Sequence, residues 1–80
     1  MDARELQNKI NYLGQERMAR QIVLEDKLAT AEEIALMTNI EVFTKLLEKY
    51  EVVSCENEVI TIVKKEDMAT YNSIVKYLSR

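Results

Sequence analysis

Residues 29–63 read ATAEEIALMTNIEVFTKLLEKYEVVSCENEVITIV, and this stretch decides the fold of the chain. Its pattern predicts a short capped helix, a tight corner, a second helix, and then two strands joined by a polar turn. The segments on both sides of it predict further helices that cover this unit. We therefore expect a mainly α-helical chain with one small β-hairpin.

The first helix of this stretch has a clear start signal. Thr30 is a good N-cap residue, and Glu33 follows three residues later. In such a capping box the threonine oxygen accepts a hydrogen bond from the Glu33 amide, and the glutamate side chain reaches back to the cap. Thr38 and Asn39 then predict a short polar corner, where Asn39 either caps or adopts a left-handed conformation. Apolar residues spaced by three and four predict a second helix from Ile40 to Tyr50.

Two β-branched runs follow this second helix. Val52–Val53 and Val59–Val63 have the composition of strands. The polar residues between them contain the expected hairpin turn, centred on Glu56-Asn57. Side chains alternate between the two faces of a strand, and isoleucine is bulkier than its neighbours here. We therefore expect Ile60 and Ile62 to face the core.

The N-terminal third carries two apolar stripes that are rotated away from each other. Residues 3–13 predict a helix whose stripe is Leu6, Ile10 and Leu13. The next stripe consists of Met18, Ala19, Ile22 and Val23, with Gly14 at the join. One interpretation is a long or kinked helix, and the other is a corner at Gly14 followed by a helix over about 15–27. A glycine costs a helix interior only about 1 kcal/mol, which is tolerable. We favour the first, because Gly14 has no other turn residue beside it except Asn11.

The C-terminal segment predicts a last helix from Glu66 to Ser79. Its acidic start and basic end both suit the helix dipole. The apolar stripe, spaced by three, four and three, is Met68, Tyr71, Val75 and Leu78, widened by Ile74.

The composition indicates one small domain over residues 1–80. Hydrophobic residues make up 48% and charged residues 31%, which is ordinary for a globular protein. With a single cysteine, Cys55, and no histidine, the chain cannot form an internal disulfide or the usual zinc ligand sets. We expect no metal and no cofactor. The cysteine usage fits a reducing, cytoplasmic location.

No apolar run is long enough to span a membrane, so no membrane association is expected. Acidic and polar residues interrupt the N-terminus, which therefore does not predict a signal peptide. The net charge of −3 weakens nonspecific attraction to phosphate, although a local basic face remains compatible with it.

Residues 30–40, TAEEIALMTNI, resemble the first helix and turn of helix-turn-helix proteins. The small alanine of the Ile34-Ala35 pair lets the next helix cross closely, and Ile40 begins the recognition helix. With the hairpin behind it, the whole resembles a winged helix of the order α(α)-α-α-β-β-α. It is similar to the winged-helix domains of phage and low-GC Gram-positive replication proteins of the replisome-organiser type. There a strand like Val59–Val63 also leads into a charged helix.

The resemblance implies double-stranded DNA as a partner, with the second helix of the motif in the major groove. Asn39 or Thr44 would read a base edge, and the lysines would meet phosphates. The predicted nucleic-acid-binding residues are Asn39, Thr44, Lys45, Lys49, Lys64 and Lys65. Arg17 and Arg20 form a second basic set. The alternative is an ordinary solvated face, because Glu41 and Glu48 balance the two lysines of this helix.

Two apolar stripes are hard to bury inside so small a chain, and we therefore predict a homodimer. The spacing of the C-terminal stripe is that of a coiled coil, although the same residues can also pack as core. The predicted dimer or partner interface comprises Leu6, Ile10, Leu13, Met68, Tyr71, Val75 and Leu78.

The sequence gives no support for an enzyme. It has no histidine, no glycine-rich phosphate loop and no G-x-S-x-G motif. Two hypotheses remain. The first is a small DNA-binding regulator of transcription or replication of phage or bacterial type. The second is a protein-interaction module, an inhibitor or adaptor, which the acidic hairpin tip and acidic pI favour.

Overall fold

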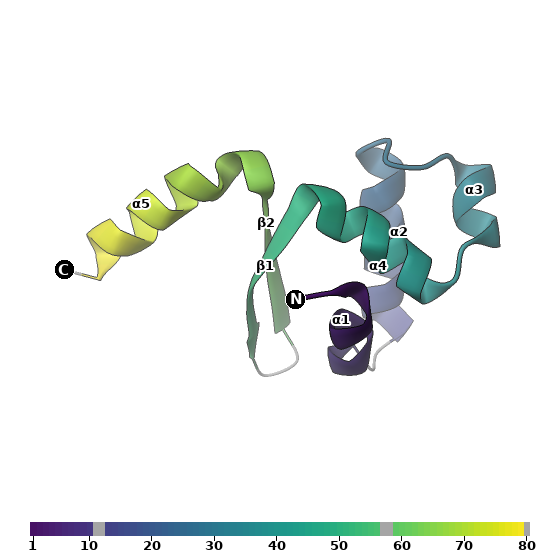
Figure 1. Ribbon diagram of the computed structural model, residues 1–80, viewed down its shortest axis with the longest axis horizontal. Coiled ribbons are helices and arrows are strands. Elements are labelled where there is room, and N and C mark those ends of the chain that lie inside the picture. Colours follow the sequence, from purple (N-terminus) through teal and green to yellow (C-terminus); the bar gives the residue numbers. More distant parts are fainter. Residues whose placement is uncertain (11–12, 57–58, 80) are drawn as a thin grey trace. The chain divides into compact units, whose positions relative to one another are not determined.

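The computed structural model describes residues 1–10, 13–56 and 59–79 (Figure 1). Across these ranges the chain is mainly α-helical and contains a two-stranded antiparallel hairpin, which confirms the predicted fold class. It divides into two compact units, residues 1–48 and residues 49–80. The two units are described in turn.

Two helices, not one, open the first unit. α1 spans Ala3–Lys9, and its N-cap Asp2 accepts a hydrogen bond from the Glu5 amide at 2.8 Å. The helix ends at Ile10, whose backbone is extended at φ −96° and ψ 102°. α2 spans Leu13–Glu25. The preferred prediction of one long helix is therefore wrong. The alternative of two helices is confirmed, although the second helix begins at Leu13 and therefore includes Gly14, where the corner was expected.

α2 ends in a left-handed turn that the sequence did not signal. Lys27 has φ 57°, the one positive φ of a non-glycine residue in the described chain. The Leu28 amide donates to the Val23 carbonyl at 2.9 Å, and the Lys27 amide donates to the Leu24 carbonyl at 3.1 Å. This pair of hydrogen bonds is a Schellman motif with lysine at the position that glycine usually occupies.

The capping box and the corner are both confirmed. α3 spans Ala31–Leu36; the Glu33 amide donates to Thr30 Oγ at 3.1 Å, and the Thr30 amide donates to Glu33 Oε1 at 3.0 Å. Met37 is extended, so the chain leaves the helix there. α4 begins one residue earlier than predicted and spans Asn39–Lys49. Thr38 accepts from the Glu41 amide at 3.3 Å and so caps α4 in place of Asn39.

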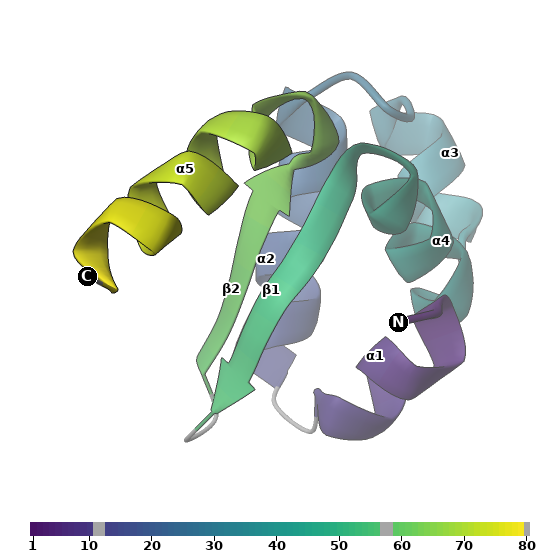
Figure 2. The same cartoon turned by 60° about the vertical axis from the view of Figure 1, so that its left-hand side comes forward.

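The helices of residues 1–48 enclose a hydrophobic core, and Figure 2 shows α1 to α4 from a second side. Its largest fully buried side chains come from three helices: Leu6 of α1, Val23 of α2, and Val42 and Phe43 of α4. The other buried apolar residues are Ile10, Ala19, Ala29, Ile34 and Leu46. Apolar spacing of three and four on each helix aligns these side chains on one face.

The second unit contains the predicted hairpin. β1 spans Tyr50–Glu56 and pairs antiparallel with β2, which spans Val59–Lys64. β1 is longer than predicted, since Ser54 to Glu56 belong to the strand and not to a turn. The other residues of the predicted turn, 57 and 58, lie outside the described residues.

The register of the hairpin contains a β-bulge. Val52 pairs with Ile62 and Ser54 pairs with Thr61, so the ladder skips Val53. Ile60 and Ile62 are half-buried and Thr61 between them is exposed, which follows the predicted alternation. Val63 is half-buried as well, so the alternation does not extend to it, and neither isoleucine is a buried core residue.

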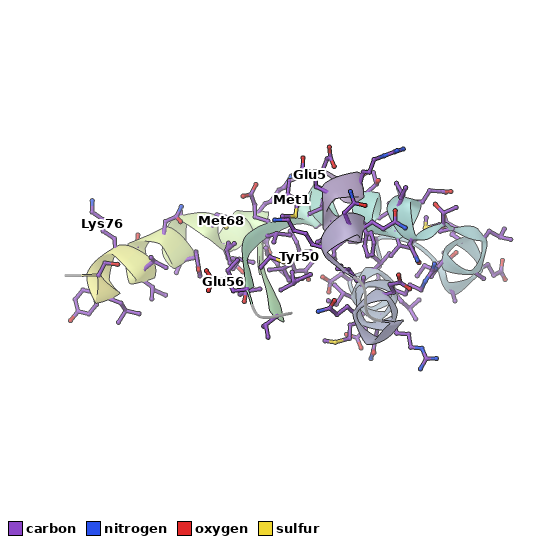
Figure 3. All side chains as sticks on the ribbon, turned by 90° about the horizontal axis from the view of Figure 1, so that it is seen from below. Met1, Glu5, Tyr50, Glu56, Met68 and Lys76 are labelled. Atoms are coloured by element: carbon purple, nitrogen blue, oxygen red, sulfur yellow. The ribbon has the colours of Figure 1, made fainter. Side chains whose placement is uncertain are left out.

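The chain then forms a short 3-10 helix, η1 (Lys65–Asp67), and the last helix, α5 (Met68–Leu78). The two acidic residues expected to open the last helix lie in η1 instead. No residue of α5 is buried. In Figure 3 the labelled Lys76 side chain projects outward from this helix. No helix in the described part of the chain has the length and apolar character needed to cross a membrane.

Candidate nucleic-acid interface

A single arginine bridges α2 to both sides of the corner between α3 and α4. Arg20 Nη1 donates to the Ile34 carbonyl at 3.0 Å, and Nη2 donates to the Met37 carbonyl at 3.2 Å. The same Nη2 donates to Asn39 Oδ1 at 2.8 Å. These partners lie in α3, in the extended connection and in the first turn of α4. The side chain is part-buried, so these hydrogen bonds are shielded from competing water.

The bridge adds donors at the end of α3, where the Ile34 carbonyl also accepts from the Met37 amide at 3.1 Å. The last carbonyls of α3 have no following helical amides to bind, which makes them acceptors for a side-chain donor. Arginine carries five N–H donors in a planar fork and no acceptor, so one side chain can reach several of these groups at once. Arg20 therefore acts in this structure as a clamp on the corner.

The Asn39 side chain, predicted as a base reader or cap, is bound within the protein by Arg20 and does not cap α4. It is the first residue of α4, it is half-buried, and its Oδ1 accepts from Arg20. Because arginine only donates, the oxygen and not the nitrogen of the amide must face it. The bond orients the amide with its oxygen toward Arg20, although that oxygen keeps a second lone pair.

The outer face of α4 is open along its length. Thr44 is exposed, and its hydroxyl donates to the Ile40 carbonyl at 2.8 Å, which leaves the oxygen as an acceptor. Lys49 at the end of α4 is exposed, as are Glu41 and Glu48. The face is therefore accessible and nearly neutral in charge, as the sequence indicated.

Lys45 is half-buried and acts on a neighbouring helix through its charge. The pKa of Glu33 in α3 is lowered, first by the hydrogen bond from the Thr30 backbone, then by that from the Thr30 side chain, and also by the positive charge of Lys45. The carboxylate of Glu33 is thus held ionised near this part of α4. A phosphate bound at Lys45 would have to compete with that attraction.

Three of the predicted lysines gather at the open end of the hairpin. Lys64 lies opposite Tyr50 in the register, Lys49 directly precedes Tyr50, and Lys65 directly follows Lys64. All three side chains are exposed. The antiparallel pairing brings together residues that are 15 and 16 positions apart. We call Lys49, Lys64 and Lys65 the lysine cluster.

The predicted dimer or partner interface divides into buried and exposed residues. Leu6 and Ile10 are only 1% and 6% exposed, so their assignment to an interface is corrected: they are core residues. Leu13 is the first residue of α2. Met68 and Tyr71 of α5 are half-buried, whereas Val75 and Leu78 are 42% and 74% exposed. Among the members of this predicted interface whose side chains the structure describes, those of the α5 stripe remain available to a partner.

The role of Arg20 was missed in the sequence, where it was grouped with Arg17 as a basic set. Arg17 is exposed, but Arg20 turns toward the corner. A signal existed: Arg20 follows the buried Ala19 directly and precedes the buried Val23 by three positions. A charged residue this close to the core stripe of a helix needs polar partners inside the protein.

The charges are distributed unevenly along the chain. Residues 1–48 carry nine acidic and six basic side chains, whereas residues 49–80 carry five of each. One of the six basic residues in the first unit, Arg20, is committed to the corner. The described residues hold no group of three or more His, Cys, Asp or Glu side chains arranged to bind a metal ion.

Comparisons with protein-family models, with curated proteins and with solved structures find no match for this chain.

Proposed function

We propose that this protein is a small DNA-binding regulator of transcription or replication, built on a winged-helix-like fold and acting in the cytoplasm. The observation that carries the proposal is the clamped corner. α3 and α4 are held at a fixed crossing by Arg20, the outer face of α4 is exposed, and a hairpin follows directly. A helix presented in this way fits the major groove of B-DNA.

The contacts would divide by type. On α4, Thr44 and the amide N–H groups of Asn39 are the polar groups suited to base edges. Lys45 on the same helix and the lysine cluster are suited to phosphate oxygens, which fix orientation but carry no sequence information. This assignment is part of the proposal and makes Lys45 and Lys49 its most direct targets.

The charge distribution favours a second candidate, a protein-interaction module that acts as an inhibitor or adaptor. The unit that contains the helix-turn-helix has an excess of acidic residues, which weakens nonspecific attraction to DNA. Leu36 at the end of α3 is 87% exposed, a large apolar side chain of the kind that protein partners cover.

Salt-dependent binding to random-sequence duplex DNA tests the first candidate. Lys45→Ala with Lys49→Ala should weaken binding and flatten the plot of log K against log salt, because each phosphate contact contributes a slope of roughly 0.9. The matched control is Lys9→Ala with Lys27→Ala, which removes the same charge from residues outside the proposed contacts. Circular dichroism should show that both variants are folded.

The outcomes separate the two candidates. If the plots of log K against log salt have equal slopes for the double variant and its control, the assigned phosphate contacts of Lys45 and Lys49 are contradicted. If no DNA is retained even at low salt, DNA binding is excluded. A single protein retained from a host extract under those same conditions then supports the second candidate.

A further inference from the structure

We infer that Arg20 is a positioning residue for α4: it sets the corner between α3 and α4 and orients the Asn39 amide with its oxygen toward Arg20. The first part concerns the free protein alone. The second part rests on the proposed function, because it states which groups α4 would offer to DNA.

The positioning role follows from where the three hydrogen bonds of Arg20 go. They reach Ile34, Met37 and Asn39 at 3.0, 3.2 and 2.8 Å, so one side chain ties α2 to both helices of the motif. The local hydrogen bonds of the corner are short-range, such as that from the Met37 amide to the Ile34 carbonyl and that from the Glu41 amide to Thr38 Oγ. Local bonds of this kind stabilise each helix end but do not fix one helix against the other.

The same geometry restricts recognition. An asparagine that reads adenine uses both its amide oxygen and its amide nitrogen. The oxygen of Asn39 is held toward Arg20 by the hydrogen bond that it accepts, although it keeps a second lone pair. A contact to adenine needs the oxygen and the nitrogen of the amide turned to the base together, so it competes with the Arg20 hydrogen bond. A contact through the N–H donors alone, to guanine O6 or N7, thymine O4 or a phosphate oxygen, does not.

Hydrogen exchange of the free protein, followed by NMR, tests the clamp. In Arg20→Gln we expect exchange at the Met37 and Glu41 amides to be roughly tenfold faster than in the wild type. Arg17→Gln is the matched control, because it removes the same charge from an exposed position one turn earlier on α2. A purely structural role would accelerate exchange throughout α1 to α4. The inference is overturned if the two variants show equal rates at the corner.

Two substitutions of Asn39 test the same hydrogen bond and leave Arg20 unchanged. Asn39→Asp keeps an acceptor for Arg20 and adds a charge-assisted bond, so corner exchange should be as slow as in the wild type or slower. Asn39→Ala removes one of the three hydrogen bonds of Arg20. Its exchange rates at the corner should therefore lie between those of the wild type and those of Arg20→Gln. Corner exchange in Asn39→Asp as fast as in Asn39→Ala would contradict the assigned hydrogen bond.

Binding to DNA separates this inference from the proposed function. With random-sequence duplex DNA, Arg20→Gln should bind several-fold more weakly than Arg17→Gln, although both have lost one positive charge. If no variant binds DNA, the proposed function fails while the exchange data still decide the clamp. If the corner loosens and the two variants bind DNA equally, a role for Arg20 in presenting α4 to DNA is excluded.

Discussion

Lys27 occupies a backbone conformation that costs free energy for any residue with a side chain. Its φ of 57° is in the left-handed region, where the Cβ atom comes too close to the following carbonyl oxygen. The Schellman hydrogen bonds from Leu28 and Lys27 hold the chain there, and the turn leads directly to Thr30 at the start of α3. The connection between α2 and α3 therefore holds Lys27 in this strained conformation.

This strain predicts that Lys27→Gly stabilises the protein by about 0.5–1 kcal/mol, since glycine adopts the left-handed region without a steric penalty. Urea unfolding followed by circular dichroism measures the change. Lys9→Gly is the matched control: Lys9 ends α1 in a right-handed helix, where glycine should destabilise by a similar amount. A lower unfolding midpoint for Lys27→Gly than for the wild type would contradict the assigned conformation.

Single residues differ in how much of their role the sequence reveals. The capping box was predictable because Thr30 and Glu33 interact across three positions. The role of Arg20 was not, because its partners lie 14 to 19 positions away and two of them are backbone carbonyls, which leave no trace in residue type. The left-handed turn was missed because its usual marker, glycine, is absent at Lys27.

At the scale of elements, the β-bulge keeps the apolar residues of the hairpin together. Val52 pairs with Ile62 and Cys55 pairs with Ile60, so these four side chains share one face of the ribbon. If Val53 were paired instead of skipped, strict alternation would place residues 52 and 55 on opposite faces. The sequence predicted the hairpin from its β-branched residues, but a register shift depends on pairing and was not predictable.

We therefore expect deletion of Val53 to preserve the pairing on both sides of the bulge. The shortened strand would place Val52 and Ser54 next to each other, which matches Ile62 and Thr61 without a skip. The pairing on the two sides is measured by cross-strand NOEs, between Val52 and Ile62 on one side and between Cys55 and Ile60 on the other. Deletion of Thr61 is the control, because it leaves two unmatched residues on β1 and should disrupt those contacts. Loss of both NOE sets in the Val53 deletion would contradict the observed register.

The helix boundaries also differ in whether local sequence or distant packing determines them. α4 begins one residue from its predicted start because its apolar spacing is regular. The sequence favours one long helix in place of α1 and α2, because Gly14 has no other turn residue beside it except Asn11. The helix instead ends at Ile10, a buried residue in extended conformation, and its burial depends on the packing of distant side chains.

At the scale of the whole molecule, the core belongs to one part of the chain. All the buried apolar residues of the described chain lie in residues 1–48. α5 is an eleven-residue helix without a buried side chain, and isolated helices shorter than about 12–15 residues are marginal in water. Its exposed apolar residues include Ile74 at 53% and Leu78 at 74%. Such a helix gains stability when a partner covers its apolar stripe.

A second copy of the chain is the partner that the stripe predicts, because the spacing of Met68, Tyr71, Val75 and Leu78 is that of a coiled-coil seam. We expect sedimentation equilibrium at micromolar concentration to give about twice the 9.3 kDa mass of one chain. Val75→Glu with Leu78→Glu should give monomers, since each change places a charge in the seam.

The matched control for the dimer is Thr70→Glu with Ser73→Glu. At 100° per residue these exposed positions lie on the opposite side of α5 from the stripe, so the same added charge should leave the dimer intact. Dissociation by both double variants would point to charge repulsion alone as the cause. A wild-type protein that sediments as a monomer would refute self-association through α5, and the exposed stripe would then favour the protein-interaction candidate over a dimeric DNA-binding regulator.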